Sequence, residues 1–150
     1  MKAPRIAATV LLLLTLSAHL HAACSNALLH GTYAFSGQGF IPITSDISPA
    51  LFLPQAVAGV ITLDGKGTVT SGSLTLNTTD PNGGPDRGTF IGTYAVDSNC
   101  KGTLETSLST GGELHFDLIV LRPAEFTVIS TDVGSSAIYS AKKIVVPKEH

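Results

Sequence analysis

The stretch Gly59-Val-Ile-Thr-Leu-Asp-Gly-Lys-Gly-Thr-Val-Thr-Ser-Gly-Ser-Leu-Thr-Leu-Asn77 decides how the rest of the chain is interpreted. Two runs rich in β-branched residues flank the tetrapeptide Asp64-Gly-Lys-Gly67. Glycine adopts positive φ without penalty, and aspartate can bond the backbone two residues further along the chain. The tetrapeptide therefore predicts a tight turn closed by a glycine bulge, and the whole stretch predicts a β-hairpin.

The chain on both sides of this hairpin continues in the same style. Apolar and polar residues alternate between clusters of Gly, Pro, Asn and Asp, which predicts short strands and no helix after the N-terminal segment. The expected strands are residues 31–38, 56–63, 68–77, 89–97, 102–109, 113–121, 124–131 and 136–144. Eight strands joined by local turns predict an all-β fold, an antiparallel up-and-down barrel. The alternative is a sandwich of two sheets.

Residues 1–23 predict a secretory signal peptide, because Lys2 and Arg5 precede a short apolar run that small residues follow. The apolar run is shorter than the ~20 residues needed to span a bilayer, so we expect no transmembrane segment after cleavage. Residues 24–150 then form a single secreted or periplasmic domain. Loss of Lys2 and Arg5 reduces the nine basic residues to seven, against eleven acidic ones. This balance, without a basic cluster, argues against nucleic acid as a partner.

The two cysteines, Cys24 and Cys100, are an even number in an exported chain, which favours a disulfide. In up-and-down order, the first strand starts at the end of the barrel where the fourth strand finishes. Both cysteines then lie at the same end, so the disulfide agrees with the topology. The alternative is a lipid anchor on Cys24, because Ala22-Ala23-Cys24 fits the end of a lipobox. His21 stands where that motif has Leu, and Cys100 would be left as a free thiol.

Residues 39–55 interrupt the strand pattern. Pro42, Pro49 and Pro54 argue against a central strand, so we expect a long loop. The loop is unusually apolar, which predicts that it covers a barrel mouth, a partner or a membrane surface. The plainer interpretation is a lid over its own domain. The candidate ligand-binding residues are Phe40, Ile41, Ile43, Leu51, Phe52 and Leu53.

A polar row on the expected strand 113–121 is the main candidate for chemistry. His115 and Asp117 share one face of that strand, and inside a barrel they could move a proton. The opposite face is wholly apolar, which favours the interpretation that the polar row faces solvent. The weak catalytic candidates are Glu105, His115 and Asp117. The chain has no nucleophile elbow, phosphate loop or metal-ligand spacing, so we expect no metal and no cofactor.

Three motifs resemble a group of uncharacterised secreted bacterial proteins: Gly31-Thr-Tyr-Ala-Phe, Gly65-Lys-Gly-Thr-Val and Gly92-Thr-Tyr-Ala-Val-Asp-Ser-Asn-Cys-Lys-Gly-Thr-Leu. Their fold is thought to be similar to the allene oxide cyclase barrel, a relative of the lipocalin-type calycins. The resemblance covers most of the mature chain and implies a barrel. Lys101 departs from the Thr expected after the cysteine. No catalytic residue is carried over, because no catalytic motif of the plant cyclases matches.

Three functions fit these observations. The first is a secreted barrel that binds a small apolar ligand under the 39–55 segment. The second is a structural or surface-associated protein with a filled core. The third is an isomerase or cyclase that uses the barrel cavity, and it requires at least two of the polar candidates to point inward. The identity of the ligand and the oligomeric state are left open.

Overall fold

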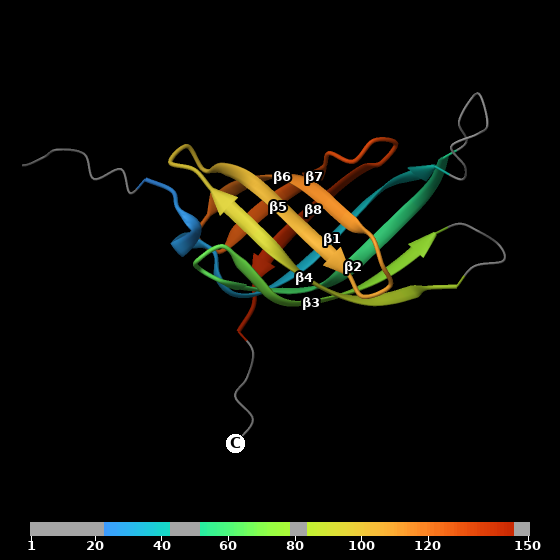
Figure 1. Ribbon diagram of the computed structural model, residues 1–150, viewed down its shortest axis with the longest axis horizontal. Coiled ribbons are helices and arrows are strands. Elements are labelled where there is room, and N and C mark those ends of the chain that lie inside the picture. The colour runs from blue at the N-terminus through green and yellow to red at the C-terminus, as the bar shows by residue number, and fades with distance from the viewer. Residues whose placement is uncertain (1–22, 43–51, 79–83, 146–150) are drawn as a thin grey trace, which may run out of the picture.

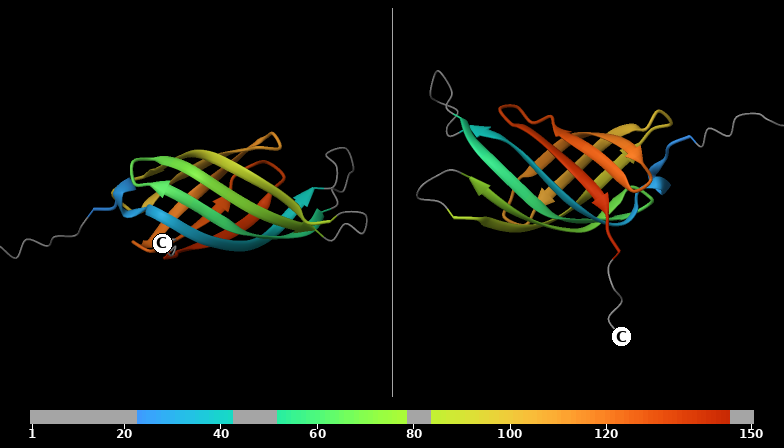
Figure 2. Two further views of the ribbon diagram at one scale, coloured as in Figure 1. Left: turned by 90° about the horizontal axis from the view of Figure 1, so that it is seen from below. Right: turned by 180° about the vertical axis from the view of Figure 1, so that it is seen from behind.

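The computed structural model describes residues 23–42, 52–78 and 84–145, and in them the chain forms a closed antiparallel barrel of eight strands. The strands follow one another around the barrel in chain order, and pairing of the last strand with the first closes it (Figure 1; Figure 2). They are β1 (His30–Pro42), β2 (Phe52–Asp64), β3 (Thr68–Thr78), β4 (Asp86–Val96), β5 (Lys101–Leu108), β6 (Glu113–Arg122), β7 (Glu125–Ser130) and β8 (Ser136–Lys143). The predicted barrel is confirmed, and the two-sheet sandwich is wrong.

The β2–β3 hairpin forms where the sequence predicts it, around the side chain of Asp64. One carboxylate oxygen of Asp64 accepts hydrogen bonds from the backbone N–H groups of Lys66, Gly67 and Thr68, at 2.7, 3.0 and 2.9 Å. These bonds, that of Thr68 foremost, hold the pKa of Asp64 below its ordinary value. Gly65 and Gly67 have φ of 76° and 116°, which side-chain-bearing residues rarely adopt.

The bulge in this hairpin lies in β3 and not at the turn glycines, which corrects the predicted glycine bulge. Thr62 pairs with Ser71 and Leu63 pairs with Val69, so Thr70 is the extra residue. The Thr70 hydroxyl donates a hydrogen bond to the carbonyl oxygen of Thr62 at 3.2 Å. Because a bulge shifts the alternation by one residue, the inward positions of β3 change from odd to even numbers.

β1 and β2 extend into both ends of the segment that was expected to be a loop. Pro54 did not prevent this, because β2 has a partner on one side only at that level; Pro49 lies outside the described residues. Pro54 pairs with Phe40 of β1, whereas pairing with β3 starts one residue later, at Gln55. Proline is tolerated where a strand is an edge. The long β1–β2 and β3–β4 hairpins therefore project beyond the shorter strands, to the right in Figure 1.

The opposite end of the barrel is filled, and we call it the sealed end. The short 3-10 helix η1 (Asn26–Leu28) lies there, beside the start of β1. The Tyr94 hydroxyl donates to the carbonyl oxygens of Leu29 and Asn26, at 2.9 and 3.3 Å, and the side-chain oxygen of Asn26 accepts the Val96 N–H at 2.7 Å. The largest fully buried side chains are Tyr33, Leu29, Leu63, Leu118 and Val69.

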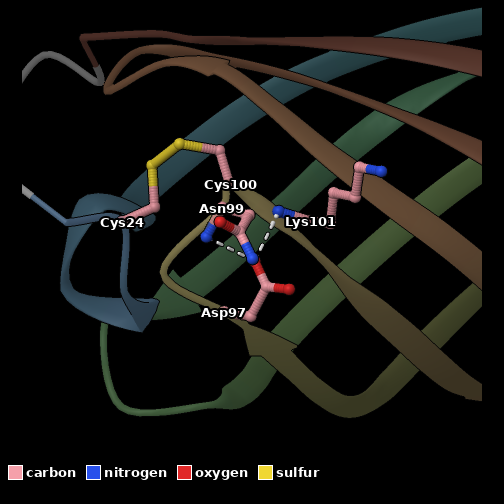
Figure 3. The surroundings of a disulfide bond; sticks show 5 residues. All are labelled: Cys24, Asp97, Asn99, Cys100 and Lys101. Atoms are coloured by element: carbon pink, nitrogen blue, oxygen red, sulfur yellow. Dashed lines mark hydrogen bonds between the residues drawn. A yellow bond between two sulfur atoms is a disulfide. The ribbon is translucent and has the colours of Figure 1, made fainter.

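A disulfide between Cys24 and Cys100 ties the N-terminal segment to this end, with 5.0 Å between the two Cα atoms and a sequence separation of 76. Figure 3 shows the turn that presents Cys100: one Asp97 carboxylate oxygen accepts the N–H groups of Asn99 and Lys101, at 2.8 and 3.0 Å. The predicted disulfide is confirmed. A lipid anchor on Cys24 needs the same sulfur atom, so that alternative is wrong for this state of the chain.

Candidate functional site

A cavity of about 240 Å³ lies inside the barrel, in the half remote from η1. Three of its wall residues mark that half: Ile41 near the end of β1, Leu108 at the end of β5 and Leu114 near the start of β6. We call this half the cavity end. Its wall is almost entirely aliphatic and aromatic. The lining residues are Phe35, Ile41, Gln55, Val57, Ile61, Leu74, Leu76, Phe90, Leu104, Thr106, Leu108, Leu114, Phe116, Phe126, Val128, Ser130, Ser135, Tyr139 and Ala141.

Between Phe35 and Ile41, β1 contributes no side chain to the cavity wall, and the backbone of β8 lies close against it: a Cβ atom added at Gly37 or Gly39 would be 2.0 or 2.2 Å from a β8 carbonyl oxygen. The inward positions of β1 between Phe35 and Ile41 are Gly37 and Gly39, which have no side chain to project. Their partners in β8 are Tyr139 and Ala137. At the sealed end, the corresponding inward positions carry large residues, so the same strands fill the barrel there.

Tyr139 occupies part of the space that Gly37 leaves free. A Cβ atom added at Gly37 would lie 2.6 Å from the Tyr139 ring, closer than real Cβ contacts allow. The ring also contacts Phe35 and Phe116 edge to face, with centroids 6.4 and 5.8 Å apart. These three neighbours hold the ring in one orientation. Burial raises the pKa of the Tyr139 phenol.

Gln55 is the other polar residue that stands out in the wall. It is 7% exposed, and its amide nitrogen Nε2 donates to the Tyr139 hydroxyl oxygen at 3.4 Å. Thr106, at 5% exposed, lines the cavity from β5. Gln55 belongs to the segment expected to form a loop, and no role is predicted from the sequence for Tyr139 or Thr106. The sequence signal that identifies Gln55 is the alternation of side chains along β2. Gln55 is an even number of residues from Val57 and Ile61, so it shares their inward face.

Of the six predicted ligand-binding residues, the structure places Ile41 in the cavity wall. Phe40 and Phe52 are on the outer face of the barrel, 51% and 50% exposed. Leu53 is partly buried but is not among the lining residues. The remaining two, Ile43 and Leu51, lie outside the described residues. The predicted residues that the structure describes lie at the end of the barrel that contains the cavity, but its wall is built from inward positions of all eight strands.

The three weak catalytic candidates lie on the outer surface. Glu105, His115 and Asp117 are exposed, and Glu105 pairs with His115 across β5 and β6. His115 bonds Asp132 twice: its ring nitrogen Nδ1 is 2.8 Å from Oδ1, and its backbone N–H donates to Oδ2 at 3.0 Å. The side-chain bond raises the pKa of His115 above its ordinary value. The interpretation of a solvent-facing row is confirmed, and none of the three reaches the cavity.

No group of three or more His, Cys, Asp or Glu residues is arranged to hold a metal ion within residues 23–42, 52–78 and 84–145. In the same residues, every helix is too short or too polar to cross a bilayer.

The solved structure of a redesigned β-barrel is similar to this chain, with a TM-score of 0.46 and 13% sequence identity, over 80% of this chain and 95% of that one. A likeness of this degree carries no functional argument. No family model and no curated protein matches the chain.

Proposed function

We propose that this protein binds a small apolar molecule in the cavity end of its barrel. The observation that carries the proposal is the cavity itself, about 240 Å³ with an aliphatic and aromatic wall. Binding sites for small molecules are typically apolar pockets with a few polar groups that orient the ligand. This cavity has that composition, with Gln55, Thr106 and Tyr139 as its main polar groups.

The volume limits the size of the ligand. An apolar cavity of ~150 Å³ is enough to bind benzene, and sites for drug-sized ligands measure about 300–1,000 Å³. The cavity of about 240 Å³ lies between these values. The ligand we propose is therefore the size of one substituted ring, such as a monoterpenoid, and not a long-chain lipid.

The energetic cost of the cavity also favours a binding role over a structural one. At about 24 cal/mol per Å³, an empty space of this size costs roughly 6 kcal/mol relative to a filled core. That cost is comparable to the whole stability of many domains, about 5–15 kcal/mol. A barrel with a purely structural role would gain stability from a larger inward residue in the cavity wall, such as at Ala141, whereas Gly37 and Gly39 have no room for a side chain because the backbone of β8 lies against them. The alternative of a filled core therefore describes the sealed end alone.

The ligand enters, in this proposal, at the cavity end. Ile41 already belongs to the wall there. Phe40 precedes Ile41 in the chain, and Leu53 pairs with Ile41 across β1 and β2. We propose that these two residues, together with Ile43, Leu51 and Phe52, contact the ligand during entry or cover it once bound. The isomerase or cyclase alternative is not proposed, because its condition of two inward-pointing polar candidates is not met.

The cellular setting follows from the N-terminus and the disulfide. We propose that residues 1–23 are a cleaved signal peptide and that residues 24–150 act as a single secreted or periplasmic domain. Disulfides persist in oxidising compartments, which supports this location. An up-and-down barrel of eight strands that holds a ligand inside is also the reason to propose a calycin-like relationship.

The test is a titration of the mature, disulfide-bonded protein with p-menthane, a hydrocarbon of one substituted ring, followed by NMR. We expect saturable shifts in the amide signals of the strands around the cavity. Leu104→Phe fills part of the cavity and should weaken binding at least about tenfold. The control is Leu121→Phe, the same substitution on the outer face, where Leu121 is 59% exposed. Equal binding by both variants, or no binding by the unmodified protein, would contradict the proposal.

A further inference from the structure

Two polar side chains meet in the cavity wall, and they can meet because the residues of β1 between them are glycines. Gln55 of β2 pairs with Gly39, and Tyr139 of β8 pairs with Gly37, so β1 separates the two polar residues. Because both glycines lack a side chain, Gln55 and Tyr139 can meet over β1, with 3.4 Å between Nε2 and the hydroxyl oxygen. Two polar groups from strands that are not neighbours thus converge at one point of an apolar wall.

Both groups have a proton left for a ligand. The Gln55 amide has two N–H bonds and uses one on the tyrosine oxygen. The Tyr139 hydroxyl accepts that bond and keeps its own proton to donate. Burial raises the pKa of this phenol, so it stays protonated at neutral pH. Two donors 3.4 Å apart can both lie about 2.9 Å from a single oxygen atom.

The wall also defines the charge of the ligand. Among the described residues that line the cavity, none is Asp, Glu, His, Lys or Arg. An ionised group moved into such a site loses its hydration and gains no opposite charge, which is costly enough to exclude it or neutralise it. A neutral oxygen with two lone pairs avoids this cost and satisfies both donors.

We propose that Gln55 and Tyr139 form an oxygen-binding subsite, and that the ligand is a neutral, ring-sized apolar molecule with one carbonyl oxygen, such as a ketone or an ester. This inference rests on the proposed function, since it concerns the same cavity. The Tyr139 ring positions the hydroxyl, because Phe35 and Phe116 pack against it edge to face. The subsite therefore needs no rearrangement to receive the oxygen.

The experiment compares three ligands that share one carbon skeleton: menthone (a ketone), p-menthane (without oxygen) and perillate (a carboxylate). Affinities are measured near neutral pH by NMR titration of the mature, disulfide-bonded protein. We expect menthone to bind most tightly and perillate most weakly. Tyr139→Phe keeps the ring and removes the hydroxyl, so it should lower the menthone affinity about fivefold and leave the p-menthane affinity unchanged.

Two further variants keep the test decisive. Gln55→Leu removes the amide and should also lower the ratio of menthone to p-menthane affinity, which tests the subsite even if Tyr139→Phe is poorly folded. Tyr94→Phe removes a buried hydroxyl at the sealed end, where it donates to Leu29, and should leave the ratio at its original value. Any of three results would overturn the proposed subsite. These are an unchanged ratio of menthone to p-menthane affinity in both cavity variants, an equal fall of that ratio in Tyr94→Phe, and preferential binding of perillate. Failure of all three ligands to bind would instead overturn the proposed function.

Discussion

The sealed end and the cavity end of the barrel are built from the same eight strands but differ in the size of the inward side chains. At the sealed end, Tyr33, Leu63 and Leu118 are at most 1% exposed, and Tyr94 bonds the chain around η1. At the cavity end, the inward side chains leave a space of about 240 Å³ between them. The comparison teaches that the closely packed end supplies stability, whereas the other end has the free volume that the proposed ligand would occupy.

The largest effect should come from removing the disulfide at the sealed end. Cys24→Ala together with Cys100→Ala releases a loop closed across 76 residues, which should lower the free energy of unfolding by about 4 kcal/mol on the chain-entropy model. Denaturant unfolding monitored by circular dichroism measures this loss. Under conditions where the variant is folded, its affinity for p-menthane should be unchanged. A small loss of stability with a large loss of affinity would reverse the roles of the two ends.

The next largest difference in stability between the two ends should come from truncating two leucines of the same strand, β6. Leu118 and Leu114 both point inward from β6, but Leu118 is 1% exposed at the sealed end and Leu114 borders the cavity. Leu118→Ala should cost about 3–4 kcal/mol, because it opens a new void in a packed region. Leu114→Ala should cost roughly 1–2 kcal/mol, because fewer contacts are lost. Equal costs in denaturant unfolding would mean that the two ends are equally packed.

Replacing an inward leucine with a larger residue should also distinguish the two ends, with a smaller difference in the free energy of unfolding. Leu118→Phe inserts extra volume where no space exists, and we expect it to cost about 1–3 kcal/mol. Leu104→Phe projects into the cavity, so its effect on the free energy of unfolding should be below about 1 kcal/mol or stabilising. Thermal unfolding of the two ligand-free variants measures the contrast. Similar destabilisation by both would contradict the presence of free volume near Leu104.

The smallest effect concerns the polar row outside the barrel. The bond to Asp132 raises the pKa of His115 above its ordinary value of about 6.5, and the backbone N–H of His115 lowers the pKa of Asp132. The contribution of His115 to stability is therefore complete below about pH 6.5 and is lost as the pH rises through the raised value. That of Asp132 is lost as the pH falls through its lowered value. Ligand affinity should not follow either titration.

An NMR titration of the His115 ring tests this pair. Asp132→Asn should return the pKa of His115 toward its ordinary value. Asp117→Asn, on the same face of β6, is the matched control and should leave the raised pKa in place. If the two variants shift the pKa equally, general acidity of the surface and not the bond to Asp132 is its cause.

Local patterns were enough to predict the architecture. The alternation around Asp64-Gly-Lys-Gly67 identified the hairpin, and the turn clusters identified the number and order of the strands. The placement of Cys24 and Cys100 at one end followed from that order. These features depend on neighbours in the chain, so sequence reasoning can reach them.

The cavity site could not be predicted in the same way. Gln55 and Tyr139 are 84 residues apart, and they meet because closure of the barrel places β1 between their strands. Proline at position 54 suggested a loop, because the one-sided pairing of β2 at that level is a property of the assembled barrel. Apolar character in residues 39–55 pointed to the end of the barrel where the cavity lies, but of the four predicted residues that the structure describes, Ile41 alone lines the wall.

The most direct test of the central claim is a crystal structure of the mature protein under xenon pressure, because xenon enters dry apolar cavities. We expect xenon density in the cavity end, among Phe90, Leu104 and Val128, and none around Leu63 and Leu118 at the sealed end. Addition of p-menthane should displace the xenon. A cavity end that holds no xenon because its side chains have closed together would contradict the claim that this half of the barrel is built to receive a molecule.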